Sequence, residues 1–327
     1  MEISINETIT DWCTLNEGFI YRDGFVFTRG KSNSAVFDRL VIRVPMRTRA
    51  NERKQGYSYR SLDEHIALVN KLQINKVRAI CDDLHFLLQC PSVSDVQVSP
   101  SYDAPEAFDY SPLYKMPCLR RLDCQTVYGT CEQYKTTIDY SQIQGLEYIA
   151  MVGGGHVGYE KLPHLRELWI SQNRTHKNFE GISYSDDLEK ITVIQSKLQT
   201  LNGIEAFSNL KSLVMYNNYS LRDISALQNT AETLRYLVIE NCSKIKDFSS
   251  LASLSRLQHL QLYGNNTIPN LTFLRNMPQL KTFTFTMNVE DGDLSLCRNI
   301  PYVSCKSRKH YNFKDAQLPK ILEEENL

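Results

Sequence analysis

The feature that most constrains this chain of 327 residues is an internal repeat with a spacing of about 23 residues. Three segments, beginning at Leu165, Leu210 and Leu257, fit the pattern L-x-x-L-x-L-x-x-N when Ile or Met is allowed at the third leucine. A fourth segment, at Leu280, fits with Phe in place of two leucines. Weaker copies begin at Val93, Leu119, Leu146, Leu188, Leu234 and Ile300. One such unit cannot bury its own leucines, so the chain must stack several units side by side.

The repeats and their connecting phrases, LQTLNGIEAFSNLKSL and LRDISALQ, resemble the short leucine-rich repeats of internalins and their intracellular relatives. The resemblance implies an α/β repeat solenoid, the leucine-rich repeat horseshoe with a parallel β-sheet on its concave face. It also implies 3₁₀ turns on the convex side. We therefore predict a leucine-rich repeat domain over residues 91–305.

The same resemblance assigns a role to the asparagine that ends the pattern. It implies that these side chains bond neighbouring backbone groups in the turn after each strand, as an asparagine ladder. The residues concerned are Asn173, Asn218, Asn265 and Asn288. Cys242 stands in that position in the repeat at Leu234, where the resemblance makes it a tolerated substitute without a redox role. Cys124 holds the third apolar position of its own repeat, so we predict that it is a core group.

Residues 1–90 are predicted to form an α+β cap that covers the apolar end of the first repeat. GFIYRDGFVF reads as a β-hairpin, and FDRLVIRVP supplies another strand, which also matches the repeat template. The segment SLDE predicts a helix capped at Ser61, followed by a second helical stretch around Val77, Ile80, Leu84 and Leu87. The region is either an extra degenerate coil or a small independent domain, and the sequence leaves both open.

Residues 306–327 are predicted to be a C-terminal cap or tail. Their basic cluster, Lys306, Arg308, Lys309 and His310, supports two interpretations. One is a solvated cap, and the other is a contact with an acidic group or a phosphate of a partner.

Charge and composition exclude several classes of function. Lys plus Arg and Asp plus Glu both number 37, so the chain has no basic field that would attract nucleic acid or an anionic membrane. We expect neither partner. The first thirty residues lack the segments of a secretory signal, and the nine cysteines are odd in number and scattered, which favours reduced thiols and a cytoplasmic protein.

No catalytic motif is present. The chain has no phosphate-binding loop, nucleophile elbow or H-E-x-x-H sequence, and Gly153, Gly154 and Gly155 read as a turn. The spacing of Cys118, Cys124 and Cys131 is unlike that of a structural zinc site. We expect no catalytic residue, metal, cofactor or small-molecule substrate.

The concave face is the candidate site. Because side chains alternate along a strand, the residues between the template leucines line this face. From the repeat at Leu146 to that at Leu257 they are rich in aromatic and aliphatic groups, which suit a protein-binding hot spot. The predicted contact residues are Tyr148, Trp169, Ile194, Val214, Tyr216, Tyr236, Val238, His259 and Tyr263.

These observations predict a non-catalytic module that binds another protein, in an inhibitor, immunity, regulatory or effector role. Two alternatives stay open. One is an extracellular adhesin like the internalins. The other is an enzyme or substrate-selecting subunit whose chemistry lies in residues 1–90, where His65, His85, Cys13, Cys81 and Cys90 are the available groups.

Overall fold

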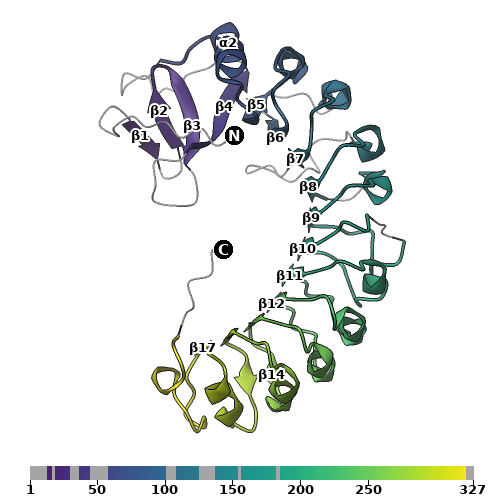
Figure 1. The fold of residues 1–327 in the computed structure, drawn as a ribbon, viewed down its shortest axis with the longest axis vertical. Helices are drawn as coiled ribbons and strands as arrows, with labels where there is room; N and C mark the ends of the chain where they lie inside the picture. Colours follow the sequence, from purple (N-terminus) through teal and green to yellow (C-terminus); the bar gives the residue numbers. More distant parts are fainter. Residues whose placement is uncertain are drawn as a thin grey trace. The chain divides into compact units, whose positions relative to one another are not determined.

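The computed structural model describes residues 13–16, 19–29, 37–44, 58–100, 108–124, 137–153, 156–181 and 185–321. The chain divides into two compact units, residues 1–158 (the N-terminal unit) and residues 159–327 (the C-terminal unit). In both, short strands alternate with return segments that contain mostly 3₁₀ turns (Figure 1).

The N-terminal unit is built on a sheet that changes from antiparallel to parallel. Strands β1 to β4 pair antiparallel, and β4 to β8 pair parallel in chain order. The strands are β1 (Cys13–Asn16), β2 (Phe19–Arg22), β3 (Phe25–Arg29), β4 (Phe37–Val44), β5 (Lys76–Cys81), β6 (Asp95–Pro100), β7 (Arg121–Asp123) and β8 (Tyr148–Val152). The helical segments are α2 (Leu62–Leu72), η2 (His85–Gln89), η3 (Ser111–Lys115) and η5 (Tyr140–Gln142).

Local sequence explains the hairpin and the helix, and both predictions are confirmed. β2 and β3 are joined by Asp23 and Gly24, whose φ angles of 51° and 88° are those of a tight hairpin turn. At Gly24 a side chain would also collide with Arg60. Helix α2 begins at a full capping box, in which the Glu64 N–H donates to Ser61 Oγ and the Ser61 N–H donates to Glu64 Oε2.

The second predicted helix is wrong at its start. Residues 76–81 form β5 instead, with Val77, Ala79 and Cys81 buried in strict alternation. The spacing of its apolar residues is compatible with a helix and with a strand. The segment forms a strand because it pairs parallel with β4 and β6. Because β4 is paired in this way, the parallel stacking of strands typical of the repeats already begins at the Phe37 template match.

The C-terminal unit carries a parallel sheet of in-register strands. Each strand of its main sheet pairs residue for residue with the next, and η7 to η11 follow the opposite side of the coils (Figure 1). The strands are β9 (Glu167–Ser171), β10 (Lys190–Ile194), β11 (Ser212–Tyr216), β12 (Tyr236–Glu240), β13 (His259–Tyr263), β15 (Thr282–Phe285) and β17 (Tyr302–Cys305), with a two-stranded sheet of β14 (Thr267–Ile268) and β16 (Asn288–Val289). The 3₁₀ segments are η6 (Tyr159–Lys161), η7 (Ile204–Ala206), η8 (Ser225–Thr230), η9 (Ser249–Ser253), η10 (Thr272–Asn276), η11 (Ser295–Asn299) and η12 (Asp315–Gln317).

The template leucines point inward, as predicted. In each of β9, β10, β11 and β13 the second and fourth residues are buried and the alternate residues are partly or fully exposed. The buried side chains form one continuous core because each coil covers the apolar side of its neighbour.

A residue in the left-handed conformation directly follows each of β9, β10, β11 and β12 and turns the chain away from the sheet. The residues are Gln172, Gln195, Asn217 and Asn241, with φ between 51° and 56°. Asparagine tolerates this conformation better than most residues. The Asn241 side chain also donates to Asn217 Oδ1 at 3.0 Å, which links two successive turns.

The asparagine ladder holds at Asn218. This side chain is fully buried, donates to Val193 O at 2.9 Å and accepts from the Ser196 N–H at 2.9 Å. Asn173 is also buried, but its Oδ1 accepts from the N–H groups of Thr175 and His176 in its own turn. Cys124 is a core group, as predicted, and Cys242, which takes the place of the asparagine in its repeat, is also buried.

The ladder prediction is wrong for the last two asparagines. Asn265 is exposed, and the bonds to Cys242 O and Ile245 O come from Asn266, because the turn through Gly264 holds one extra residue. Asn288 lies in β16. In that coil the Tyr311 hydroxyl accepts from the Val289 N–H and donates to Met287 O.

The C-terminal segment packs on the last coil. The Val303 N–H donates to Pro319 O and the Ile321 N–H donates to Pro301 O, so this segment pairs with the open edge of β17. Lys320 contacts both Val303 O and the Asp315 carboxylate. Residues 306–321 therefore cover the outermost strand, as a cap does.

We predict that Asn218→Ala lowers the free energy of unfolding by about 2 kcal/mol or more, because a buried N–H and a buried carbonyl lose their partners. Urea denaturation followed by circular dichroism measures the change. Asn202→Ala is the control, since Asn202 is exposed in the same unit, and it should change stability by less than about 0.5 kcal/mol. Equal effects of both variants would contradict the ladder assignment.

Candidate protein-binding surface

The candidate surface is the strand face, defined as the first, third and fifth residues of β9 to β13. The in-register pairing arranges these residues in three straight rows across the sheet. The first row runs Glu167, Lys190, Ser212, Tyr236, His259; the third runs Trp169, Thr192, Val214, Val238, Gln261; the fifth runs Ser171, Ile194, Tyr216, Glu240, Tyr263. Eight of the nine predicted contact residues lie on this face. Seven of the eight are partly exposed, Val238 being the exception.

Hydrogen bonds hold several of these side chains in place. Gln261 Nε2 donates to the Tyr236 hydroxyl at 3.1 Å, and the Tyr263 hydroxyl shares a hydrogen bond with Thr284 Oγ1 at 2.6 Å. The Tyr236 and His259 rings pack with centroids 5.8 Å apart, and His259 Nδ1 lies 2.9 Å from Thr282 Oγ1. Tyr236, His259 and Tyr263 are therefore each held by at least one contact with a neighbouring side chain.

Tyr216 and Tyr236 stay uncharged at neutral pH. Partial burial raises the pKa of Tyr216, and the charge of Glu240 and the nearby Tyr263 raise it further. Burial together with Tyr216 and Tyr263 also raises the pKa of Tyr236. These phenols act as neutral hydrogen-bonding groups on an apolar ring.

Trp169 is partly exposed, but its Nε1 is buried and has no hydrogen-bond partner among the described residues. Its row neighbour Thr192 and the ion pair between Lys190 Nζ and Glu167 Oε1, at 3.5 Å, adjoin it. A buried donor without a partner is uncommon in folded proteins. The ring therefore gains a hydrogen bond if it reorients when a partner binds.

Val238 needs a correction. Its side chain is 0% exposed, so a partner cannot touch it while its neighbours keep their positions. It lies between Val214 and Gln261 in the third row, and Gln261 is hydrogen-bonded to Tyr236 beside it. Val238 therefore packs beneath the side chains of its neighbours and is not a contact residue of the face.

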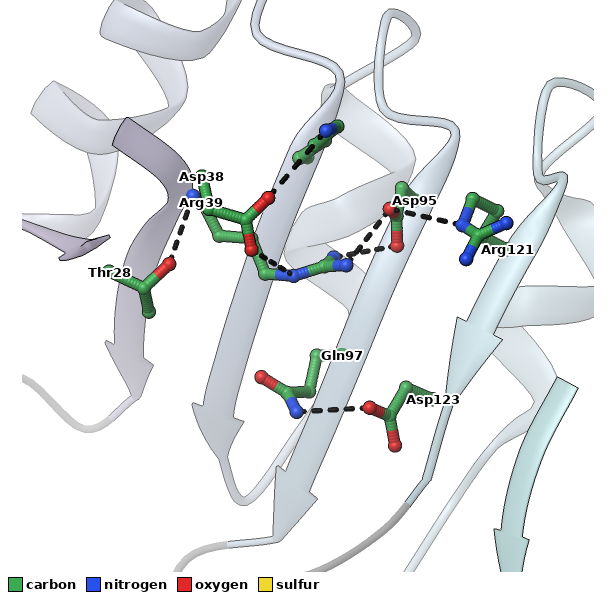
Figure 2. A network of polar contacts seen from close by, with 8 residues as sticks. Thr28, Asp38, Arg39, Asp95, Gln97, Arg121 and Asp123 are labelled. Atoms are coloured by element: carbon green, nitrogen blue, oxygen red, sulfur yellow. Dashed lines mark hydrogen bonds and ion pairs between the residues drawn. The ribbon is translucent and has the colours of Figure 1, made fainter. Parts of the chain in front are cut away.

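Tyr148 belongs to the N-terminal unit, whose strand face has a different character. The Arg121 guanidinium lies 4.0 Å from the centroid of the Tyr148 ring, so a charged group covers this tyrosine. Figure 2 shows the rest of this polar network. The Arg39 guanidinium donates two bonds to Asp95, at 2.6 and 2.9 Å, and Arg121 Nε lies 3.6 Å from the same carboxylate.

Burial makes this cluster structural. Asp95 is 5% exposed, and it ties β4, β6 and β7 together through Arg39 and Arg121. Burial opposes the Arg39 charge, yet the hydrogen bond and the charge of Asp95 outweigh it and raise the pKa of Arg39. The sequence analysis missed this cluster, although the repeat pattern places Asp95 and Arg121 at the same position of neighbouring strands.

Glu240 is the other residue that sequence reasoning did not single out. It is partly exposed in the fifth row, with Tyr216 on one side and Tyr263 on the other. The aligned repeats place these three residues in neighbouring strands, so the signal was available in the sequence.

No protein-family model matches the chain, and no curated protein matches it. Among solved structures, the crystal structure of an internalin (InlF) from Listeria monocytogenes is similar, with 16% sequence identity, 73% of this chain and 70% of that chain covered, and a TM-score of 0.51. The fold is a leucine-rich repeat solenoid. A leucine-rich repeat protein of Leptospira interrogans also matches, at 12% identity, with 76% of this chain and 81% of that chain covered and a TM-score of 0.38.

Thiol chemistry in this leucine-rich repeat protein is suppressed by burial. Desolvation raises the pKa of Cys81 and Cys297 to about 12, and that of Cys90 and Cys242 to about 11. A thiol with such a pKa is almost entirely protonated at neutral pH and is a poor nucleophile. The side chains of Cys13 and Cys131 lie outside the described residues.

The described residues contain no group of three or more His, Cys, Asp or Glu that could hold a metal ion. Within the same ranges, no helix has the length and apolar character needed to cross a membrane.

We predict that Asp95→Ala destabilises the N-terminal unit by about 3 kcal/mol, because the partly buried Arg39 guanidinium loses both hydrogen bonds to Asp95 and keeps only the more exposed Asp38, at 3.3 Å. Urea unfolding measures the loss. Glu147→Ala is the control: Glu147 is exposed in the same unit, and its removal should cost less than about 0.5 kcal/mol. A small effect of Asp95→Ala would show that the network adds little to stability.

We also predict that iodoacetamide at pH 8 labels Cys118 at least about 100-fold faster than Cys81, Cys90, Cys242 and Cys297, because Cys118 is exposed and these four thiols are buried with raised pKa values. Mass spectrometry of a Cys13→Ser, Cys131→Ser protein identifies the labelled sites. Comparable labelling of Cys242 would contradict its place in the core.

Proposed function

We propose that this chain is a non-catalytic module that binds another protein through the strand face of its C-terminal unit. The observation that carries the proposal is the set of ordered, partly exposed aromatic side chains on this face. Trp and Tyr dominate protein-binding hot spots because they offer a large contact area and lose few rotamers on binding. A partly apolar, contiguous surface of this kind typically marks an interaction site.

Charge supports a protein partner over nucleic acid. The chain is neutral in sum, and the only basic side chain in the three rows, Lys190, is paired with Glu167. Such a face offers little to a phosphate backbone. We propose a cytoplasmic location because the described cysteines are free thiols.

The environment of His65, Cys81 and Cys90 argues against catalysis by these three groups of residues 1–90. His65 is buried, its Nδ1 lies 2.8 Å from Ser61 O, and burial lowers its pKa. Cys90 Sγ donates to Phe86 O, and Cys81 is buried. These groups serve the packing of the cap, and neither thiol has a lowered pKa that would activate it.

We expect the double variant Trp169→Asp, Val214→Asp to lose its partner, because two carboxylates on the strand face would be desolvated by any protein that covers it. Affinity capture from native cell lysate, with wild type and variant in parallel, measures the loss. A protein retained by wild type and reduced at least about tenfold with the variant is the expected result.

The matched control is Ala206→Asp, Asn276→Asp, which adds the same charge at exposed positions of η7 and η10. It should capture the partner like wild type, and circular dichroism should show all three proteins folded. Equal retention by wild type and by the Trp169, Val214 variant would refute the strand face as the binding surface.

A further inference from the structure

We infer that the strand face recognises an arginine side chain of its protein partner, bound by the Glu240 carboxylate between the rings of Tyr216 and Tyr263. The inference rests on the proposed function, and it adds the chemistry of one contact. It assigns a role to the one acidic group of the face that has no charged partner.

The register of the sheet places the three residues side by side. Tyr216 pairs with Glu240 and Glu240 pairs with Tyr263, all at the fifth position of their strands. Neighbouring strands are about 4.8 Å apart, so the carboxylate has an aromatic ring on each side at close range. All three side chains are partly exposed, which leaves the group open to a partner.

The carboxylate has no compensation within the described residues. The backbone carbonyl of Glu240 accepts hydrogen bonds, but its carboxylate forms no hydrogen bond or ion pair with any described residue, whereas Glu167, the other acid of the face, has Lys190 at 3.5 Å. The Tyr263 hydroxyl is already engaged by Thr284. A partner that covered this face without a cation at Glu240 would bury an unpaired charge, which is costly.

A guanidinium fits this arrangement better than an ammonium. It can donate two parallel hydrogen bonds to a carboxylate and at the same time lie flat against an aromatic ring. The N-terminal unit contains a related arrangement: the Arg121 guanidinium lies 4.0 Å from the Tyr148 centroid while its Nε forms an ion pair with Asp95 at 3.6 Å. In the N-terminal unit the chain supplies the arginine itself, and at Glu240 the partner supplies it.

A random-peptide display library tests the inference, with the whole protein as target. Peptides are selected on wild type and counter-selected on the Trp169→Asp, Val214→Asp variant, so that they bind the strand face. Their affinities are then measured by calorimetry for wild type and Glu240→Gln, each with the peptide arginine intact or replaced by citrulline, which is neutral and nearly isosteric.

We expect selected peptides to share an arginine. Citrulline should weaken binding to wild type at least about tenfold, and Glu240→Gln should do the same. On the Glu240→Gln protein, citrulline should cost less than about threefold, because the two changes remove one interaction. Glu205→Gln, which removes the same charge from η7 away from the face, should bind every peptide like wild type.

Two results would overturn the inference, and they differ in what they leave standing. Peptides that lack a shared arginine, or that bind Glu240→Gln as tightly as wild type, would refute the arginine contact while the strand face remained the binding surface. If no peptide distinguished wild type from the Trp169, Val214 variant, the arginine contact and the proposed function would both fail.

Discussion

The structure depends on one constraint, which is that a single repeat cannot bury its own apolar residues. A strand of five residues has only two that point inward, such as Leu213 and Met215 of β11, and the coil on either side must cover them. Stacking solves this for every coil except the first and the last. At the C-terminal end residues 306–321 pair with β17, and in the N-terminal unit the hairpin and α2 adjoin β4.

Stacking also brings backbone polar groups into the core, and these must be paired. The buried side chain of Asn218 satisfies one carbonyl and one N–H of the preceding coil. In the last coils Asn266 and Tyr311 do this work, from positions that the repeat pattern does not mark. What is invariant is the need of the buried backbone for hydrogen bonds, and the residue that meets it varies with the shape of each turn.

The sequence predicted the features that follow from periodicity and local capping. The inward leucines, the Asp23–Gly24 hairpin and the Ser61 capping box depend on near neighbours along the chain, so their patterns were legible. The segment at Val77 was wrongly predicted as a helix because the spacing of its apolar residues is compatible with a helix and with a strand. Pairing with the neighbouring strands β4 and β6 selects the strand. The ladder failed at Asn265 because one extra residue in a turn leaves the leucine spacing unchanged.

The candidate site was predictable in part for the same reason. Alternation along a strand identified which residues face outward, and eight of nine predicted residues lie on the strand face. Burial of Val238 was not predictable, because it depends on how Gln261 and Tyr236 lie beside it. The Arg39–Asp95–Arg121 cluster depends on pairing between strands that are far apart in sequence.

The exact register of β9 to β13 has a consequence for how such a surface can diversify. Between these strands the connecting segments differ in length, and the turn after β13 has gained a residue, yet the pairing of the strands does not shift. Length changes are thus absorbed in the turns, and the grid of outward positions keeps its spacing. Evolution can therefore replace one outward side chain at a time while the strand positions stay the same. A new binding specificity then requires substitutions and no insertion or deletion in the strands.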